Sequence, residues 1–222
     1  MRILAMADIH GEFDVYDRLP SLVARPRAEA VVLAGDLLGA FGESPTTEEA
    51  QTANAREISE RLSPLRVQVL YVMGNDDFVE LEPGSERIQP LHGRRVEMGP
   101  YNFVGYEYSP PFMCGVFEEP EEEIAADIAR LEPLMDRQTI LVTHSPAEGI
   151  LDRGFFNRSA GSPSILAAVK RRSVLAHTHG HIHACFGREG RHFNVAVARQ
   201  RRAMVMELPV LDHSVITWGQ GS

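Results

Sequence analysis

Residues 1–10 read MRILAMADIH, in which the short apolar run 3–7 ends at Asp8. A run of this length and composition predicts a buried β-strand. Four similar runs follow: 30–34 before Gly35-Asp36, 67–72 before Gly74-Asn75-Asp76-Asp77, 139–142 before Thr143-His144, and 174–176 before HTHGHIH at 177–183. Side chains with oxygen or imidazole nitrogen therefore follow the ends of five predicted strands, where they can project into a cleft.

Helical patterns separate these runs. They are predicted over 13–24, from Thr46 or Thr47 to about Leu62, from Pro120 to about Met135, and over 161–172. Pro20 lies inside the first, which predicts a kink or two short helices. Residues 39–46 predict a loop, 86–108 short strands and turns, and 109–119 an irregular loop that could overhang a pocket.

The segment from about 184 to 218 predicts three short strands, with a hairpin near Gly187–Gly190. Helical parts together with this β-rich segment predict an α/β fold of two stacked sheets with helices outside. Candidate ligands follow strand ends, where open α/β sheets bind their ligands. No repeat or linker divides the 222 residues, so we expect one domain spanning 1–222.

The formal net charge of −9 argues against a dedicated DNA or RNA binder, although it leaves a nucleotide substrate open. No stretch approaches the roughly 20 apolar residues of a membrane span. Asp8 interrupts the first apolar run too early for a signal peptide, so we expect a cytoplasmic protein. Cys114 and Cys185 show no CxxC spacing; two ordinary thiols are favoured over a disulfide.

Taken singly, each motif is weak. A Gly-Asp pair such as Gly35-Asp36 is also common in loops and helix caps. A single histidine after a strand, such as His144, is more often a hydrogen-bonded structural residue than a ligand. His181 and His183 are more informative, because alternate residues of an extended segment point the same way. Imidazole and carboxylate without thiolate suit Mn, Fe, Zn, Co or Ni.

The ordered set resembles the calcineurin-like metallophosphoesterase superfamily, whose pattern is DxH, GD, GN, a lone His and GHxH. The resemblance runs from Asp8 to His183 and implies a four-layer α/β/β/α sandwich, two packed sheets flanked by helices. It also implies two divalent cations, with manganese the first choice. The implied ligands are Asp8, His10 and His183 for the first cation, Asn75, His144 and His181 for the second, and Asp36 as a bridge between them.

With two cations about 3.5–4 Å apart, we expect a bridging water to lose a proton and the hydroxide to attack phosphorus in line. The predicted function is a metal-dependent hydrolase of phosphodiesters or phosphomonoesters, with small diesters slightly favoured and Asp36, Asn75, Asp76 and His144 as catalytic residues. The alternative is a non-catalytic metal-binding scaffold of the same fold that acts in protein–protein interaction. The formation of a homo-oligomer is left open by the sequence.

Asp76 departs from the family pattern, which commonly has His after the GN pair. Three interpretations are open. Asp76 is an acid whose pKa is raised by burial or a neighbouring carboxylate; another group, such as His177 or His179, fills the role; or the leaving group departs unaided, so that only activated esters react quickly. We favour the last.

Several other residues are interpreted as structural. A structural role is favoured for His177 and His179, and surface or core positions for His92, His192 and His213. The basic clusters Arg171-Arg172 and 199–202 are typical of solvated faces or a helix C-terminus. Phe112 and Met113 either line a pocket or belong to an ordinary packed loop.

Overall fold

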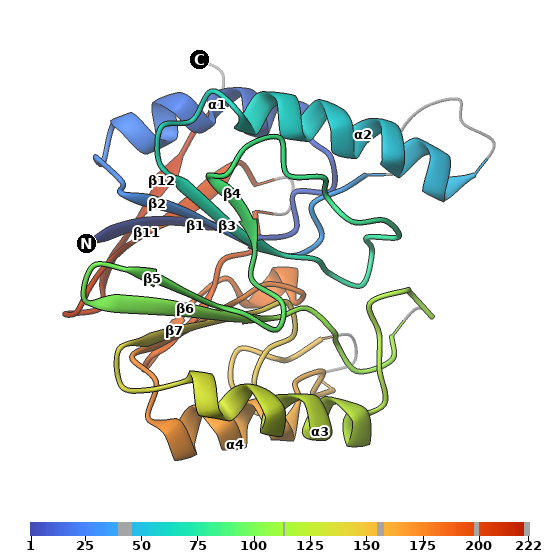
Figure 1. The fold of residues 1–222 in the computed structure, drawn as a ribbon, viewed down its shortest axis with the longest axis vertical. Helices are drawn as coiled ribbons and strands as arrows, with labels where there is room; N and C mark the ends of the chain where they lie inside the picture. Colours follow the sequence, from blue (N-terminus) through green and yellow to red (C-terminus); the bar gives the residue numbers. More distant parts are fainter. Residues whose placement is uncertain (40–45, 113, 155–157, 198–199, 220–222) are drawn as a thin grey trace.

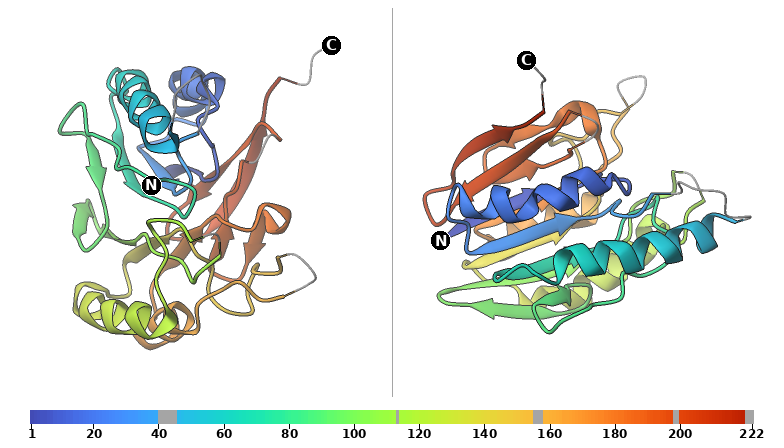
Figure 2. Two further views of the ribbon diagram at one scale, coloured as in Figure 1. Left: turned by 90° about the vertical axis from the view of Figure 1, so that its right-hand side faces the viewer. Right: turned by 90° about the horizontal axis from the view of Figure 1, so that it is seen from above.

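The computed structural model describes residues 1–39, 46–112, 114–154, 158–197 and 200–219, which form four layers (Figure 1). Helices α1 (Phe13–Ala24) and α2 (Thr47–Leu62) lie side by side over one sheet. Helices α3 (Glu121–Leu131) and α4 (Pro163–Arg172) cover the other, as the further views also show (Figure 2). The expected α/β/β/α sandwich is therefore confirmed.

Each sheet has six strands in the described part of the chain. The first has the order β12-β11-β1-β2-β3-β4, and β1 to β4 run parallel. Its strands are β1 (Arg2–Met6), β2 (Ala30–Ala34), β3 (Gln68–Val72), β4 (Ile88–Pro90), β11 (Arg202–Glu207) and β12 (Asp212–Thr217).

The second sheet has the order β5-β6-β7-β8-β10-β9, with β6, β7, β8 and β10 parallel. Its strands are β5 (Arg95–Met98), β6 (Tyr101–Tyr106), β7 (Thr139–Thr143), β8 (Ala176–His179), β9 (Gly187–Glu189) and β10 (His192–Asn194). Two 3₁₀ turns, Glu132–Leu134 and His183–Cys185, follow α3 and β8.

The central strands of each sheet are buried on both faces, with successive side chains packing against opposite layers, whereas the edge strand β12 is largely exposed. In β1, Ile3 and Ala5 face the second sheet, whereas Leu4 and Met6 pack under α1 and α2. In the second sheet, Val104 and Leu141 pack likewise against α3 and α4. Burial on both faces explains why the central strands read as continuous apolar runs.

The predicted elements agree with the structure in most places. Thr46 caps α2 by accepting a hydrogen bond from the Glu49 backbone N–H at 3.2 Å. The prediction of two short helices over 13–24 is wrong: α1 continues through Pro20, with buried Tyr16, Leu19 and Leu22 securing both halves. The C-terminal segment holds four strands rather than three. The loop predicted over 39–46 lies almost entirely outside the described residues.

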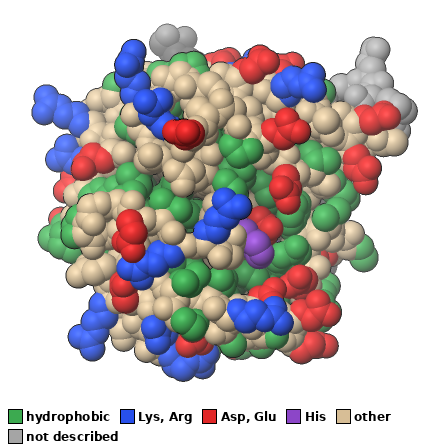
Figure 3. Space-filling model, viewed as in Figure 1, with side chains coloured by type: hydrophobic (Ala, Val, Ile, Leu, Met, Phe, Trp, Pro, Cys, Tyr) green, Lys and Arg blue, Asp and Glu red, His purple; other side chains and the backbone are tan. Residues whose placement is uncertain are grey.

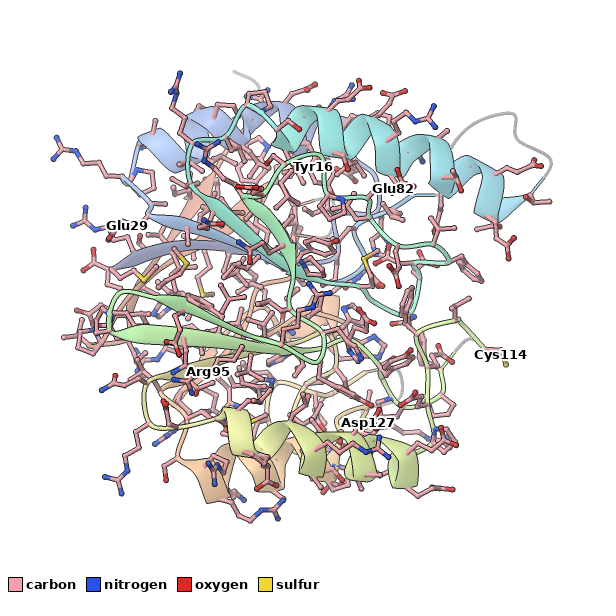
Figure 4. The ribbon with its side chains drawn as sticks, in the orientation of Figure 1. Tyr16, Glu29, Glu82, Arg95, Cys114 and Asp127 are labelled. Carbon is pink, nitrogen blue, oxygen red and sulfur yellow. The ribbon has the colours of Figure 1, made fainter. Side chains whose placement is uncertain are left out.

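Cys114 and Cys185 are free thiols, as expected, and Cys114 is exposed on the loop after β6 (Figure 4). Over the face shown in Figure 3, acidic and basic side chains are interspersed, with no broad basic surface. Among the described helices, none combines the length and hydropathy that crossing a membrane requires.

Parallel pairing sets where the polar motifs lie. Strands β1, β2 and β3 are neighbours in one sheet, and β7 and β8 are neighbours in the other. Because parallel strands end at the same edge, the residues that follow them gather on one side of the sandwich.

Candidate metal centre

Backbone hydrogen bonds join the segments that follow the strands. The Asp8 N–H donates to the Gly35 carbonyl, and the His10 N–H donates to the Asp36 carbonyl, both at 2.9 Å. Across the sandwich, the His181 N–H reaches both carboxylate oxygens of Asp8 at 3.1 Å. The first, second and last motifs are thus held together before any cation binds.

Four candidate ligands have left-handed backbone conformations. The φ angles of Asp8, His10, Asp36 and His181 are 56°, 48°, 51° and 68°. Non-glycine residues are uncommon in this region. Each residue held in such a sparsely populated conformation costs about 1–3 kcal/mol. Such strain persists where surrounding contacts enforce it, which is typical of functional sites.

The first cluster of side chains contains Asp8, His10 and His183. An oxygen of Asp8 lies 3.1 Å from His183 Nε2, which lies 3.4 Å from His10 Nε2. One ligand atom from each of the three residues falls within 4.8 Å of the other two. A single cation could therefore contact all three after small adjustments of the side chains.

The second cluster contains Asn75, His144 and His181. The amide oxygen of Asn75 lies 3.0 Å from His144 Nε2, and the rings of His144 and His181 are 5.1 Å apart. Asp36 lies between the clusters, with Oδ2 at 3.3 Å from His144 Nε2 and 3.9 Å from His10 Nε2. The structure thus brings all seven predicted ligands together.

The orientation of two imidazoles fits a cation. His144 Nδ1 lies 3.0 Å from the Ala34 carbonyl, which can only accept, so Nδ1 carries the proton. His10 Nδ1 lies 3.0 Å from Oδ2 of Asp76. When these imidazoles are neutral, both contacts leave the lone pair of Nε2 facing the cluster, which is how histidine ligands are commonly supported. The oxygen and nitrogen donors suit the divalent metals expected from the sequence.

Glycine is required at positions 35 and 74 because side chains of the centre approach the backbone closely there. A Cβ at Gly35 would collide with the His144 ring, and one at Gly74 would collide with the Asp36 carboxylate. Glycine at these two positions therefore allows the motifs to come into contact.

Burial and charge shift the pKa values in opposite directions. Burial lowers the pKa of His10, but Asp76 and Asp36 outweigh this effect and raise it to about 9. Burial likewise lowers the pKa of His144, but Asp36 raises it to about 10. Burial would raise the pKa of Asp36, yet His144 and His10 hold it below its usual value. The carboxylates thus create a negative potential that attracts protons or cations.

Asp77 is a site residue to which sequence analysis gave no role. It is fully buried, and its carboxylate accepts backbone N–H groups of Leu37 at 3.2 Å, Leu38 at 2.7 Å and Gly74 at 2.9 Å. It therefore connects the loop after Asp36 to the loop that carries Asn75. Burial and the Asp36 charge raise the pKa of Asp77 to about 7.

Gln51 of α2 was also missed. Its amide donates to the Asp76 carbonyl at 2.7 Å and accepts from the Phe78 N–H at 2.6 Å. On the neighbouring helix, the Tyr16 hydroxyl donates to the Leu37 carbonyl at 2.8 Å (Figure 4). A polar residue on the buried face of α2 is the signal that could have revealed Gln51.

His177 and His179 are fully buried behind the centre, in agreement with a structural role. His177 contacts Thr143 Oγ1 at 2.8 Å and His192 Nδ1 at 2.9 Å. Burial, together with neighbouring imidazoles, lowers the pKa values of both. Neither lines the cleft, which makes them poor candidates to protonate a leaving group.

Three arginines of the basic clusters form contacts away from the centre, whereas Arg202 donates to the carbonyl of the candidate ligand His183 at 3.3 Å. Arg171 pairs with Glu132, Arg172 donates to the Met135 carbonyl, and Arg201 pairs with Asp14 at 3.3 Å. Arg199 lies outside the described residues. His92 is half-buried and His213 is exposed, and neither lines the cleft or belongs to a group of candidate ligand atoms.

A cleft of about 820 Å³ opens over the centre. His10, Asp36, Asn75, His181 and His183 lie at its floor, while Asp8 and His144 are buried beneath them. Its walls are lined by Pro110, Pro111 and Phe112 and by residues 153, 154 and 158–161. Phe112 therefore lines a pocket; Met113 lies outside the described residues. Arg153 and Arg158 also line the cleft, and no sequence motif marked them.

The sequence profile of calcineurin-like phosphoesterases matches residues 1–185. Among the solved structures that share the fold, three are informative. The protein TT1561 of Thermus thermophilus has a TM-score of 0.70 at 17% identity, over 97% of this chain and 98% of that one.

A dimetal phosphatase from Danio rerio has a TM-score of 0.60 at 14% identity, over 99% of both chains. An archaeal phosphodiesterase has a TM-score of 0.51 at 12% identity, over 98% of this chain and 100% of that one. Among curated proteins, none matches the sequence.

Metal loading should release protons. Cation binding requires neutral imidazole, whereas the pKa values of His10 and His144 are about 9 and about 10 without metal. Apparent Mn²⁺ affinity should therefore rise between pH 6 and pH 9, and calorimetry in buffers of different ionisation enthalpy should detect proton release at pH 7. Affinity that is constant over this range would contradict the proton competition.

Asp77→Ala should lower the free energy of unfolding of the metal-free protein by about 3 kcal/mol or more, because it leaves three backbone N–H groups without their acceptor. Urea unfolding measures this change. The neighbouring Asp76→Ala is the matched control and should cost about 1 kcal/mol, because Asp76 is partly exposed. Equal losses in the two variants would contradict the role of Asp77.

Proposed function

The chain belongs to the calcineurin-like phosphoesterase family, and from this premise we propose that it hydrolyses small phosphodiesters at a centre for two divalent cations. Family membership makes it a metal-dependent phosphoesterase, and thus a hydrolase. The number of cations, the type of ester and the roles of single residues are our proposal. The position of the Asp36 carboxylate between two clusters of ligand atoms carries it.

We assign one cation to Asp8, His10 and His183, the other to Asn75, His144 and His181, and Asp36 to both. Asp8 also belongs to a second group of close ligand atoms, with Asp36 and His144, as a compact two-cation centre requires. When bound, the cations would supply Lewis acidity that lowers the pKa of water and offsets charge on the phosphoryl oxygens. Hydrolysis joins a water oxygen to phosphorus and breaks one ester P–O bond, leaving a phosphomonoester and an alcohol.

The Asp76 carboxylate at the edge of the cleft favours a diester over a monoester. Asp76 lies at this edge with 42% of its side chain exposed, so its charge faces an incoming phosphate. A phosphodiester carries one negative charge, whereas a phosphomonoester carries nearly two at neutral pH. Repulsion by Asp76 therefore disfavours the monoester more strongly.

Asp76 acts as a positioning residue for His10 in this proposal, and not as the acid. Its Oδ2 is engaged with His10 Nδ1 at 3.0 Å, and its backbone N–H donates to Oδ1 of Asp36 at 2.9 Å. It thereby supports one ligand through its side chain and another through its backbone. Unaided departure of the leaving group stays a prediction.

Hydrolysis of bis-p-nitrophenyl phosphate with added Mn²⁺ tests the function. We expect turnover that chelation removes, and a decrease in kcat of about 100-fold or more for Asp36→Asn, which removes the charge of the bridge, and for His181→Ala, which removes a ligand. His213→Ala, which changes an exposed imidazole, is the matched control and should retain full activity. Metal binding without turnover on a panel of phosphate esters would contradict the enzyme and favour the scaffold.

Asp76→Ala should weaken Mn²⁺ binding about 10-fold or more, since loss of a carboxylate that supports a histidine ligand typically costs 10–100-fold. Asp76→Asn should bind better than Asp76→Ala, because its amide oxygen still accepts from His10 Nδ1. Competition with a fluorescent chelator measures both. Wild-type affinity in Asp76→Ala would refute the positioning role.

A further inference from the structure

The cleft is much larger than a single phosphoryl group and has two unlike walls. About 820 Å³ is available, with the candidate ligands confined to its floor. One part of its lining is apolar, and another part carries two arginines, Arg153 and Arg158. The walls can therefore contact parts of the substrate other than the ester that reacts.

Phe112 presents an aromatic surface to the cleft. Although it is a large apolar side chain, 52% of it is exposed, and its ring lies 5.3 Å from that of His181. The Phe112 N–H donates to Glu118 at 2.9 Å. Further along the same loop, Gly115 approaches the Asn75 carbonyl so closely that a Cβ would collide with it. The aromatic wall is thus attached to the ligand segment.

The wall with the arginines consists of two antiparallel segments, 152–154 and 158–160, that are attached to the GHxH segment. The Gly154 N–H donates to the Arg158 carbonyl and the Ala160 N–H donates to the Asp152 carbonyl, both at 3.0 Å. The buried Asp152 carboxylate accepts from the Gly149 N–H at 2.7 Å and from the Ser159 hydroxyl. Cys185, two residues after His183, contacts the Arg153 carbonyl at 3.5 Å.

The two arginines have different surroundings. Arg153 Nε lies 3.8 Å from Oδ1 of Asp152, a buried oxygen without a hydrogen bond, so Arg153 offsets that charge. Within the described ranges, the Arg158 side chain makes no hydrogen bond or ion pair. A guanidinium presents several N–H donors in a planar fork that matches phosphate geometry. Arg158 is therefore the cation in the cleft wall that can meet an anion.

We propose that Arg158 binds a second anionic group of the substrate, remote from the ester that reacts, while Phe112 contacts a planar ring between the two. The substrate class is a nucleotide-like phosphodiester with an additional phosphate. This inference rests on the proposed function for the reacting ester. The inference adds that the substrate carries a second negative charge. Without Arg158, the net charge of −9 and Asp76 at the edge of the cleft would repel that charge.

Binding of two product-like probes to the Mn²⁺-loaded protein tests the proposal without turnover. Thymidine 3′,5′-bisphosphate should bind about 10-fold more tightly than thymidine 5′-phosphate in calorimetry, as one charge-assisted hydrogen bond predicts. Arg158→Ala should abolish this preference and leave the affinity for the monophosphate unchanged. The matched control is Arg188→Ala, which removes the same charge from an exposed arginine outside the cleft and should keep the preference.

Kinetics provide a second readout. The p-nitrophenyl ester of thymidine 5′-phosphate should have a KM about 10-fold higher than the same ester with a 3′-phosphate, and Arg158→Ala should remove the difference without changing kcat. Equal affinity for both probes in the wild type, or an unchanged preference in Arg158→Ala, would overturn the subsite. Failure to hydrolyse either ester would contradict the proposed function, while the binding comparison still decides on Arg158.

Discussion

The buried carboxylate of Asp36 is the constraint on which the centre depends. It lies between His144 and His10, accepts the Asp76 backbone N–H, and is only 4% exposed. A buried carboxylate is costly unless positive charge and hydrogen-bond donors surround it. The two imidazoles supply these in the absence of metal, and divalent cations would supply more. The fold therefore buries a negative charge that the proposed cations would neutralise.

The surrounding backbone is organised to keep that charge in place. Asp77 gathers N–H groups from the loops after β2 and β3, while Gln51 holds the second loop from the helix side. Gly35 and Gly74 permit the contacts with His144 and Asp36. The left-handed conformations of four candidate ligands are the conformational cost of this arrangement, and burial of apolar residues between the sheets offsets it.

Asp76 and Arg158 give the cleft opposite charges at different places. Asp76 replaces the histidine common in the family and contacts His10, so the substitution changes both the support of a ligand and the potential at the edge. Arg158 and Phe112 both line the cleft. A substrate with one charge at the centre and another near the wall would satisfy both. The specificity of the proposed enzyme thus depends on loops, while the sheets position the chemistry.

The sequence by itself predicted the succession of strands and helices along the chain and the polar motifs after five strands, whereas the four layers and the seven candidate ligands followed from the family resemblance that those motifs carry. It could do so because apolar runs and the residues after them are local patterns, readable without knowledge of packing. Tertiary structure decided what local patterns do not contain: the hydrogen bonds of Asp77 and Gln51, the contact of Asp76 with His10, and the presence of Arg153 and Arg158 in the cleft. These depend on which loops meet, and that follows from how the two sheets pack and which strand ends share an edge.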